Sequence, residues 1–256
     1  MSDFSAAPAA SGSGTFSVGG VLKRSFSTFF ANIVPFGVLA LILYLPTLIY
    51  GFASLSELES GVVTGYSVGD VVITLLSFVL TYILVAALVY GTVQHLGGQR
   101  PSLGAIVSRG LATIVPVVVI AVLLTLVVSI GFVLLIVPGI FLTVVYAVVI
   151  PAAVVERPGI IGSFKRSWEL TKGHRWPVLG ILLVLLVILF VLAAVIGAIA
   201  GVVFFTMGDF TALVVVNYVI SAFSGALMSV TIAVTYHDLR VAKEGATSAQ
   251  IAAVFD

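Results

Sequence analysis

Long apolar blocks with almost no charged residues dominate the chain. A helix needs about 20 mostly apolar residues to cross a bilayer, and six blocks meet or approach this length. They cover residues 33–53, 71–95, 111–136, 140–155, 176–207 and 211–236. Only Val137-Pro138-Gly139 separates the third block from the fourth, and since proline and glycine favour tight turns, we expect a hairpin there. The pattern predicts an all-α, polytopic membrane protein with six transmembrane helices.

Three short segments between the blocks share a second pattern, in which an arginine stands among apolar residues. The segments are SVGGVLKRSF, SLGAIVSRGL and GIIGSFKRSW, and their arginines are Arg24, Arg109 and Arg166. A proline lies further along the chain after each arginine, namely Pro35, Pro116 and Pro177. Each segment is followed by two apolar blocks. We therefore expect three repeats, at about residues 15–96, 101–155 and 159–238, each an amphipathic in-plane helix plus a transmembrane hairpin.

The third segment shows why these helices should lie in the membrane plane. Its apolar stripe at helical spacing consists of Ile160, Ile161, Phe164, Trp168 and Thr171, whereas Lys165, Arg166, Glu169 and Lys172 face away. Such a helix lies at the interface, with its cations among lipid headgroups. The residues predicted to contact headgroups are Arg24, Arg109, Lys165, Arg166, Lys172 and Arg175. Membrane lipids, anionic ones in particular, are thus the expected partners.

Composition strengthens the membrane assignment and removes several alternatives. The 256 residues are 61% hydrophobic and only 8% charged, whereas a soluble domain is about one quarter charged. The absence of cysteine excludes disulfides, thiolate metal sites and cysteine nucleophiles. The small number of basic residues argues against a nucleic-acid partner, because binding requires neutralised phosphates.

The distribution of charge predicts the orientation. All 11 lysines and arginines fall on one side of the six-span arrangement, while Glu57, Glu59, Asp70 and Asp209 fall on the other. Basic residues stay in the cytoplasm, so both termini are expected there. Residues 1–14 are rich in serine, alanine, glycine and proline and are expected to be a disordered tail, residues 15–245 the membrane domain, and residues 246–256 a second tail.

Two rows of small residues suggest how the last two blocks pack. The rows, with a spacing of four, are Ala193, Gly197 and Gly201, and Ser221, Gly225 and Ser229. Small residues at this spacing let helices approach closely in lipid. We expect the fifth and sixth helices to meet along this seam, with a dimer face as the alternative use of one row. Asp238 is a candidate to form an ion pair with one of the three recurring arginines.

Three motifs in the second half resemble a known family. They are IVPGIFL at 136–142, AVVERPGIIGSFKRSWELTKGHRW at 153–176 and YHDLRVAKEG at 236–245. They are similar to a bacterial six-helix membrane family that includes the membrane domain of some glycerophosphoryl diester phosphodiesterases. This resemblance implies an integral domain of the bacterial inner membrane, here without the catalytic domain, and it carries no established activity.

Candidate chemistry is sparse. No acidic residue lies deep inside a block, which argues against an ion or proton pathway. His95, His174 and His237 lack the spacing of a metal site. We expect no enzymatic activity, no metal and no cofactor. The leading hypothesis is a membrane scaffold or lipid-interacting module, and the alternative is a channel or transporter for a small or lipidic substrate.

Overall fold

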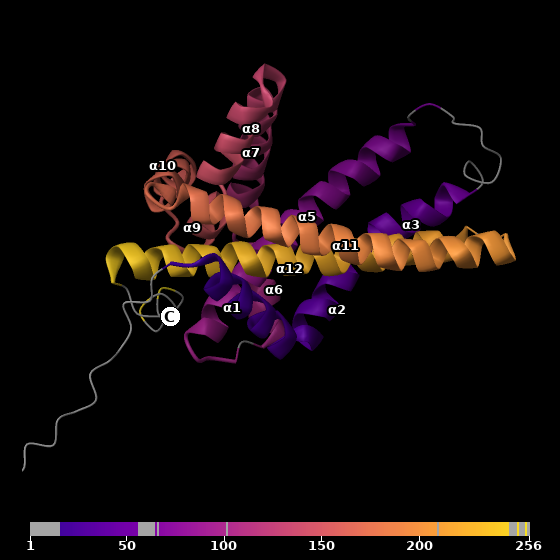
Figure 1. Ribbon diagram of the computed structural model, residues 1–256, viewed down its shortest axis with the longest axis horizontal. Helices are drawn as coiled ribbons and strands as arrows, with labels where there is room; N and C mark the ends of the chain where they lie inside the picture. Colours follow the sequence, from indigo (N-terminus) through magenta and orange to yellow (C-terminus); the bar gives the residue numbers. More distant parts are fainter. Residues whose placement is uncertain are drawn as a thin grey trace, which may run out of the picture.

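The computed structural model describes residues 16–55, 65, 67–100, 102–208, 210–245, 250 and 254, and every regular element among them is helical (Figure 1). In chain order the helices are α1 (Val18–Ala31), α2 (Ile33–Leu43), α3 (Leu45–Ala53), α5 (Val68–Leu96), α6 (Leu103–Ala112), α7 (Ile114–Leu134), α8 (Ile136–Val145), α9 (Val149–Val155), α10 (Gly159–Thr171), α11 (Arg175–Met207) and α12 (Thr211–Glu244). Glu57, Glu59, Asp209, the tail 1–14 and most of the segment 246–256 lie outside the described residues.

The described residues confirm the all-helical prediction, and several of the helices are long and apolar enough to span a membrane. In the described part of the chain, five helices are long and apolar enough to span a membrane, or six if the bent pair α1–α2 forms one span. The first predicted block is divided: α2 turns by 83° from α1 and meets α3 at Tyr44. Likewise, α8 and α9 together make one 20-residue candidate span, Ile136–Val155.

The hairpin between α7 and α8 forms, but its turn is not where the sequence suggested. The chain reverses at Leu135, which has an extended backbone with φ −165° and ψ 155°. Pro138 and Gly139 lie inside the first turn of α8 instead. A Cβ on Gly139 would lie 2.4 Å from Cγ of Phe132, and one on Gly131 would lie 3.1 Å from Cα of Gly139. These two glycines therefore allow α7 and α8 to approach closely.

Prolines mark the helix starts. Five helices carry proline as their third residue: Pro35 in α2, Pro116 in α7, Pro138 in α8, Pro151 in α9 and Pro177 in α11. The first four N–H groups of a helix have no partner within it, so a residue without an N–H costs no hydrogen bond there. The positions at which these helices begin are therefore encoded by the sequence nearby.

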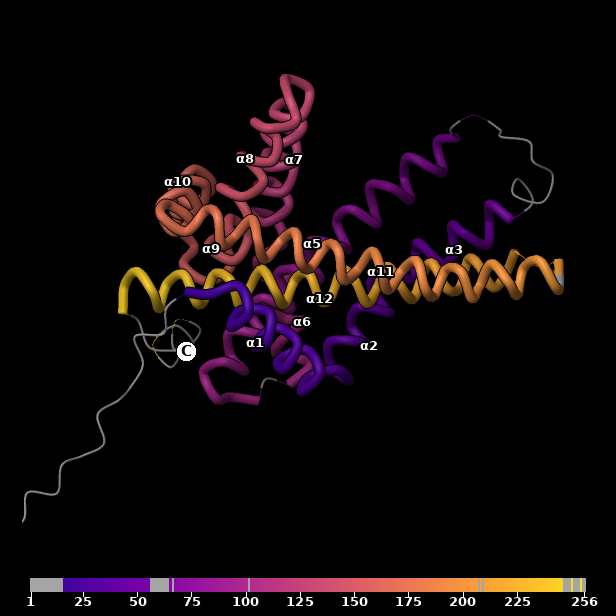
Figure 2. The backbone as a smooth tube through the Cα atoms, viewed as in Figure 1, coloured from indigo at the N-terminus to yellow at the C-terminus, as the bar shows by residue number. Residues whose placement is uncertain are grey.

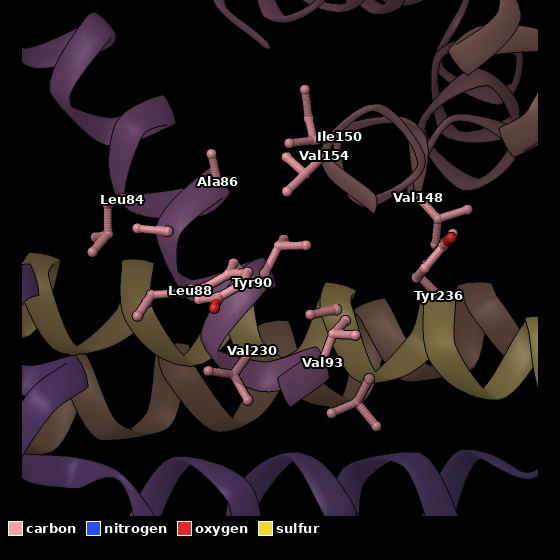
Figure 3. Packing of buried hydrophobic residues seen from close by; sticks show 14 of the residues in the cluster. Leu84, Ala86, Leu88, Tyr90, Val93, Val148, Ile150, Val154, Val230 and Tyr236 are labelled. Carbon is pink, nitrogen blue, oxygen red and sulfur yellow. The ribbon is translucent and has the colours of Figure 1, made fainter. Parts of the chain in front are cut away.

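The core lies at one end of the molecule, in a region that we call the hub. The hub consists of residues 83–94 of α5, all of α9 and residues 222–239 of α12, most of which are buried. Figure 3 shows their side chains together, among them Leu88, Val154 and Val230. The short helices α1, α6 and α10 pack on the hub, against α12, α5 and α9 respectively.

Away from the hub, the long helices diverge. The α7–α8 hairpin and the α11–α12 pair leave the hub in different directions (Figures 1 and 2). Their outer parts are covered by exposed apolar side chains, such as Val133 at 86% and Phe205 at 86% of full exposure. Apolar surface of this extent is unusual on a soluble monomer, whereas a lipid environment accommodates it.

The predicted glycine seam between α11 and α12 does not form. A Cβ on Gly197 or Gly201 would meet nothing within 4 Å. An apolar hollow of about 330 Å³ lies between the two helices, lined by Leu192, Ile196, Val215, Val216, Val219, Ile220 and Phe223. The α12 row serves other contacts: Gly225 accommodates Tyr44, Ser229 bonds back to the Gly225 carbonyl at 2.7 Å, and Ser221 is half-buried.

Candidate functional site

A network of charged groups joins three elements at the hub. Arg166 of α10 donates from Nε to Oε2 of Glu156, just after α9, at 2.6 Å, and also pairs with Glu244 at the end of α12. Arg240 lies 3.0 Å from Glu244. Tyr236 donates its hydroxyl to Oε1 of Glu156 at 2.7 Å. One polar cluster therefore ties α9, α10 and α12 together.

The network is balanced in charge, with two carboxylates and two guanidiniums. Burial opposes the charge on Arg166, but its hydrogen bonds with Glu156 and Glu244 outweigh burial and raise the pKa of the Arg166 guanidinium above its ordinary value. The side chains of Arg166 and Glu156 are 21% and 19% exposed, so these bonds are only partly screened by solvent. Arg166 was predicted to contact lipid headgroups, but its guanidinium instead forms ion pairs with carboxylates of the protein.

A second ion pair attaches α1 to α12. Nη2 of Arg24 lies 2.5 Å from Oδ2 of Asp238, whose side chain is only 6% exposed. Nδ1 of His237 lies 3.2 Å from the other carboxylate oxygen. Asp238 therefore pairs with Arg24, one of the three arginines that recur in the sequence, and this contact joins α1 to α12.

The buried face of α10 is small and polar. Ser163, Ser167, Leu170 and Thr171 are buried on it. The break between α8 and α9 leaves the carbonyl of Val145 without its usual helical partner, because the Val149 N–H donates to Tyr146 instead. Ser167 donates to the Val145 oxygen at 2.8 Å, and the Thr171 hydroxyl, shared between this oxygen at 3.2 Å and the Ser167 carbonyl at 2.9 Å, is a second donor. These hydroxyls thus satisfy a buried backbone acceptor that would otherwise be costly.

The opposite face of α10 remains outside. Ile161 is 84% exposed and Trp168 is 41% exposed. Lys165 and Lys172 are exposed as well. The guanidinium carbon of Arg175 lies 4.6 Å from the Trp168 ring centroid and 4.9 Å from that of Phe141, so Arg175 contacts two aromatic rings.

Arg109 completes the set of six cations predicted to meet headgroups. Its guanidinium lies 5.9 Å from the centre of the Tyr90 ring. Arg24, Arg166, Arg109 and Arg175 thus all have interactions within the protein, although Arg24 is still 51% exposed. Lys165 and Lys172 are exposed as well.

A cavity of about 200 Å³ lies beside the network, between the α6–α7 junction, α9 and the start of α10. It is lined by Ala112, Thr113, Pro116, Ile120, Ala153, Arg157, Gly159 and Ser163. One wall is apolar, and the rest carries two hydroxyls and a guanidinium. This mixed lining differs from that of the hollow between α11 and α12.

Metal chemistry finds no support in the described part of the chain. No group of three or more histidine, cysteine, aspartate or glutamate side chains there is placed to hold a metal ion. His237 instead lies against Asp238, and the ring of His174 meets Phe16 edge to face at 5.3 Å.

Sequence reasoning missed Glu156 and Glu244 as members of the network. The spacing of Arg240 and Glu244 by four residues could have indicated one contact. Arg166 and Glu244 are 78 residues apart, and no local pattern signals that pair.

A family model matches most of the chain. Residues 9–239, most of the chain, match the domain of unknown function DUF7847. The chain belongs to the DUF7847 family. No curated protein matches it significantly, and neither does any solved structure. The family therefore adds a relationship but no activity, and proposals about function depend on the geometry of the hub.

Proposed function

We propose that this DUF7847 protein is a non-enzymatic, lipid-interacting scaffold of the bacterial inner membrane, with the hub at the level of the cytoplasmic headgroups. One observation carries the proposal: α10 packs onto the protein through Ser163, Ser167, Leu170 and Thr171 and leaves two large apolar residues outside. Ile161 and Trp168 are exposed on α10, and Lys165 and Lys172 are exposed beside them. This is the surface of a helix that lies in a bilayer interface.

The basic end of the molecule supports the choice of leaflet. The two ion-pair groups, Glu156–Arg166–Glu244–Arg240 and Arg24–Asp238, are each neutral overall. The remaining lysines and arginines leave a surplus of positive charge at the hub, which suits the anionic cytoplasmic leaflet. In this proposal α1, α6 and α10 are equivalent in-plane helices of three repeated units, each leading into apolar helices.

A transporter of lipidic substrates is the alternative. The observation that favours it is a second apolar hollow of about 330 Å³ at the α2–α12 contact, lined by Phe29, Ile33, Val34, Gly37, Val38, Ala40, Leu41, Val219, Ala222, Phe223 and Ala226. Such a lining suits an acyl chain better than a hydrated solute. Transport of labelled lipid between leaflets of reconstituted vesicles would favour this alternative over a scaffold.

The depth of Trp168 tests the scaffold proposal. The chain has two tryptophans, so Trp176→Phe leaves Trp168 as the only reporter. In nanodiscs we expect lipids brominated near the top of the acyl chain to quench its fluorescence, because indole rings sit at the interface. A variant that also carries Trp168→Phe gives the background. Quenching by aqueous iodide but not by brominated lipid would show that α10 lies outside the bilayer, and would contradict the proposal.

A further inference from the structure

The cavity beside the charged network has the features of a ligand site. Its apolar wall is formed by Ala112, Pro116, Ile120 and Ala153, and Arg157 lines it together with the hydroxyl residues Thr113 and Ser163. It opens where the in-plane helices α6 and α10 meet the base of α7. In a membrane-embedded protein with its hub at headgroup level, this location is the boundary between headgroups and acyl chains.

The backbone at Arg157 is unusual. Arg157 has φ 51°, and it is the one residue other than glycine in the described part of the chain with a positive φ. Side chains other than glycine rarely adopt this conformation, and such strain gathers at functional sites. At this turn the two adjacent residues belong to different sites. The carboxylate of Glu156 contacts Arg166 and Tyr236, whereas Arg157 lines the cavity.

The charge on Arg157 is not neutralised within the described residues. None of their carboxylates forms an ion pair with it. The nearest carboxylate in sequence, Glu156, is engaged by two arginines and a tyrosine. This distinguishes Arg157 from Arg24, whose charge is offset by Asp238.

The two hydroxyls in the lining do not compete with Arg157 for an anion. Thr113 donates its proton to the carbonyl of Arg109 at 3.0 Å, and Ser163 donates to the carbonyl of Gly159 at 2.7 Å. A hydroxyl has a single proton to donate, so both oxygens remain as acceptors. Arg157 is therefore the group in this lining that selects for negative charge, and a guanidinium suits a phosphate in particular.

We propose that this cavity binds an anionic glycerophospholipid, with its phosphate at Arg157 and the first carbons of an acyl chain against Pro116 and Ile120. The inference rests on the proposed function, since the hub has to lie at headgroup level. Val115 and Val119 are 71% and 39% exposed on the same turns of α7. They extend the apolar surface that the rest of the acyl chain would contact. A phosphate with an apolar tail satisfies both parts of the lining.

Lipid titration of the full-length protein tests the proposal by native mass spectrometry in mild detergent. We expect phosphatidylglycerol to bind more tightly than phosphatidylcholine. Arg157→Gln should weaken phosphatidylglycerol binding about fivefold or more, since one basic group near an anionic lipid contributes on this scale. Arg157→Lys should retain most of the affinity. Arg100→Gln, which removes an exposed arginine from the loop before α6, is the matched control and should change the affinity less than twofold.

A second variant tests the apolar part of the site without removing charge. Ala112 lines the cavity and is exposed at its rim, so Ala112→Phe should obstruct it and leave the buried core intact. We expect it to weaken phosphatidylglycerol binding while the protein keeps its melting temperature. Inorganic phosphate and glycerol phosphate, added as competitors, distinguish a free phosphate ligand from a lipid, and we expect neither to displace phosphatidylglycerol at millimolar concentration.

Several outcomes would overturn the inference. Equal losses in Arg157→Gln and Arg100→Gln would mean diffuse attraction rather than a site. Displacement by inorganic phosphate would replace the lipid with a free anion. Equal binding of both lipids by the unmodified protein would remove the headgroup specificity, yet leave the scaffold proposal standing if Trp168 still reports a position in the bilayer. Failure of the Trp168 experiment as well would remove the proposed function itself.

Discussion

Gly197 and Gly225 are alike in sequence, each the centre of a row of small residues, but they differ in their surroundings. Gly197 faces open space, whereas a Cβ on Gly225 would lie 2.3 Å from the Tyr44 hydroxyl and 2.9 Å from Cζ of that ring. The need for glycine at Gly225 comes from an aromatic ring at the junction of α2 and α3, not from α11. A small residue in such a row therefore need not mark a helix contact, since Gly197 has no protein atom near the position of its missing Cβ.

This difference gives a prediction at the scale of one residue. Gly225→Ala should destabilise the protein by about 1–3 kcal/mol, because the methyl group overlaps the Tyr44 side chain, and thermal unfolding in detergent measures the effect. Gly197→Ala, the matched control, should leave the melting temperature unchanged or raise it, since alanine favours helix. Tyr44→Phe should recover part of the loss at Gly225. Equal melting shifts for the two glycine variants would contradict the assignment of these contacts.

At the scale of the elements, α10 reverses the usual use of an amphipathic helix. A helix on a soluble protein buries its apolar stripe, but here the residues buried are chiefly Ser163, Ser167 and Thr171. Their hydroxyls suit the break between α8 and α9, where the Val145 carbonyl needs donors. Ile161 and Trp168 are thereby left for lipid. The predicted stripe was wrong at its other end: Thr171 is buried, and the ring of Phe164 meets that of Tyr146 edge to face at 5.1 Å.

The hydrogen bonds to Val145 can be removed with small changes in volume. Ser167→Ala together with Thr171→Val should destabilise the protein by about 1–3 kcal/mol, because a buried carbonyl loses both side-chain donors. The control is Thr206→Val at the exposed end of α11, where the hydroxyl bonds only to carbonyls of its own helix. Hydrogen exchange should show faster opening of α10 in the double variant alone. Unchanged exchange there would rule out this role for the two hydroxyls.

At the scale of the whole molecule, a buried hub at one end is combined with long helices that diverge from it. The hub residues have neighbours on all sides, whereas α11 exposes large apolar side chains along its length, among them Phe190 at 69% and Phe205 at 86%. Lipid, unlike water, allows such helices to separate without a large penalty. We infer that packing within the protein constrains the positions of the long hairpins less than it constrains the hub.

The orientation of the molecule can be tested with single cysteines, because the chain has none of its own. Helix α11 has 33 residues, or about 50 Å, so its ends extend beyond a hydrocarbon core of about 30 Å. In spheroplasts, a membrane-impermeant maleimide should label Thr206→Cys at once and Lys172→Cys only after lysis. Lys165→Cys should behave like Lys172→Cys. Immediate labelling at Lys172→Cys would reverse the proposed orientation.

Local sequence determined the helical class, the approximate ends of most long helices and the outward position of Ile161 and Trp168 on α10. These properties depend on residues within one or two turns of each other: apolar length sets a span, and a proline among the first residues begins a helix, as in α7 and α11. The same local information placed the α7–α8 hairpin but missed Leu135 as its turn, because Pro138 is accepted equally well inside a helix start.

Tertiary structure alone decided which groups meet. Arg166 pairs with Glu244 across 78 residues, Gly225 accommodates Tyr44, and Arg157 lines a cavity together with residues of α6, α7, α9 and α10. None of these contacts has a sequence period, because each depends on how separate helices are placed around the hub. The chain thus specified its helices, and packing determined which of its cations are neutralised, because ion pairs form only where separate helices bring opposite charges together.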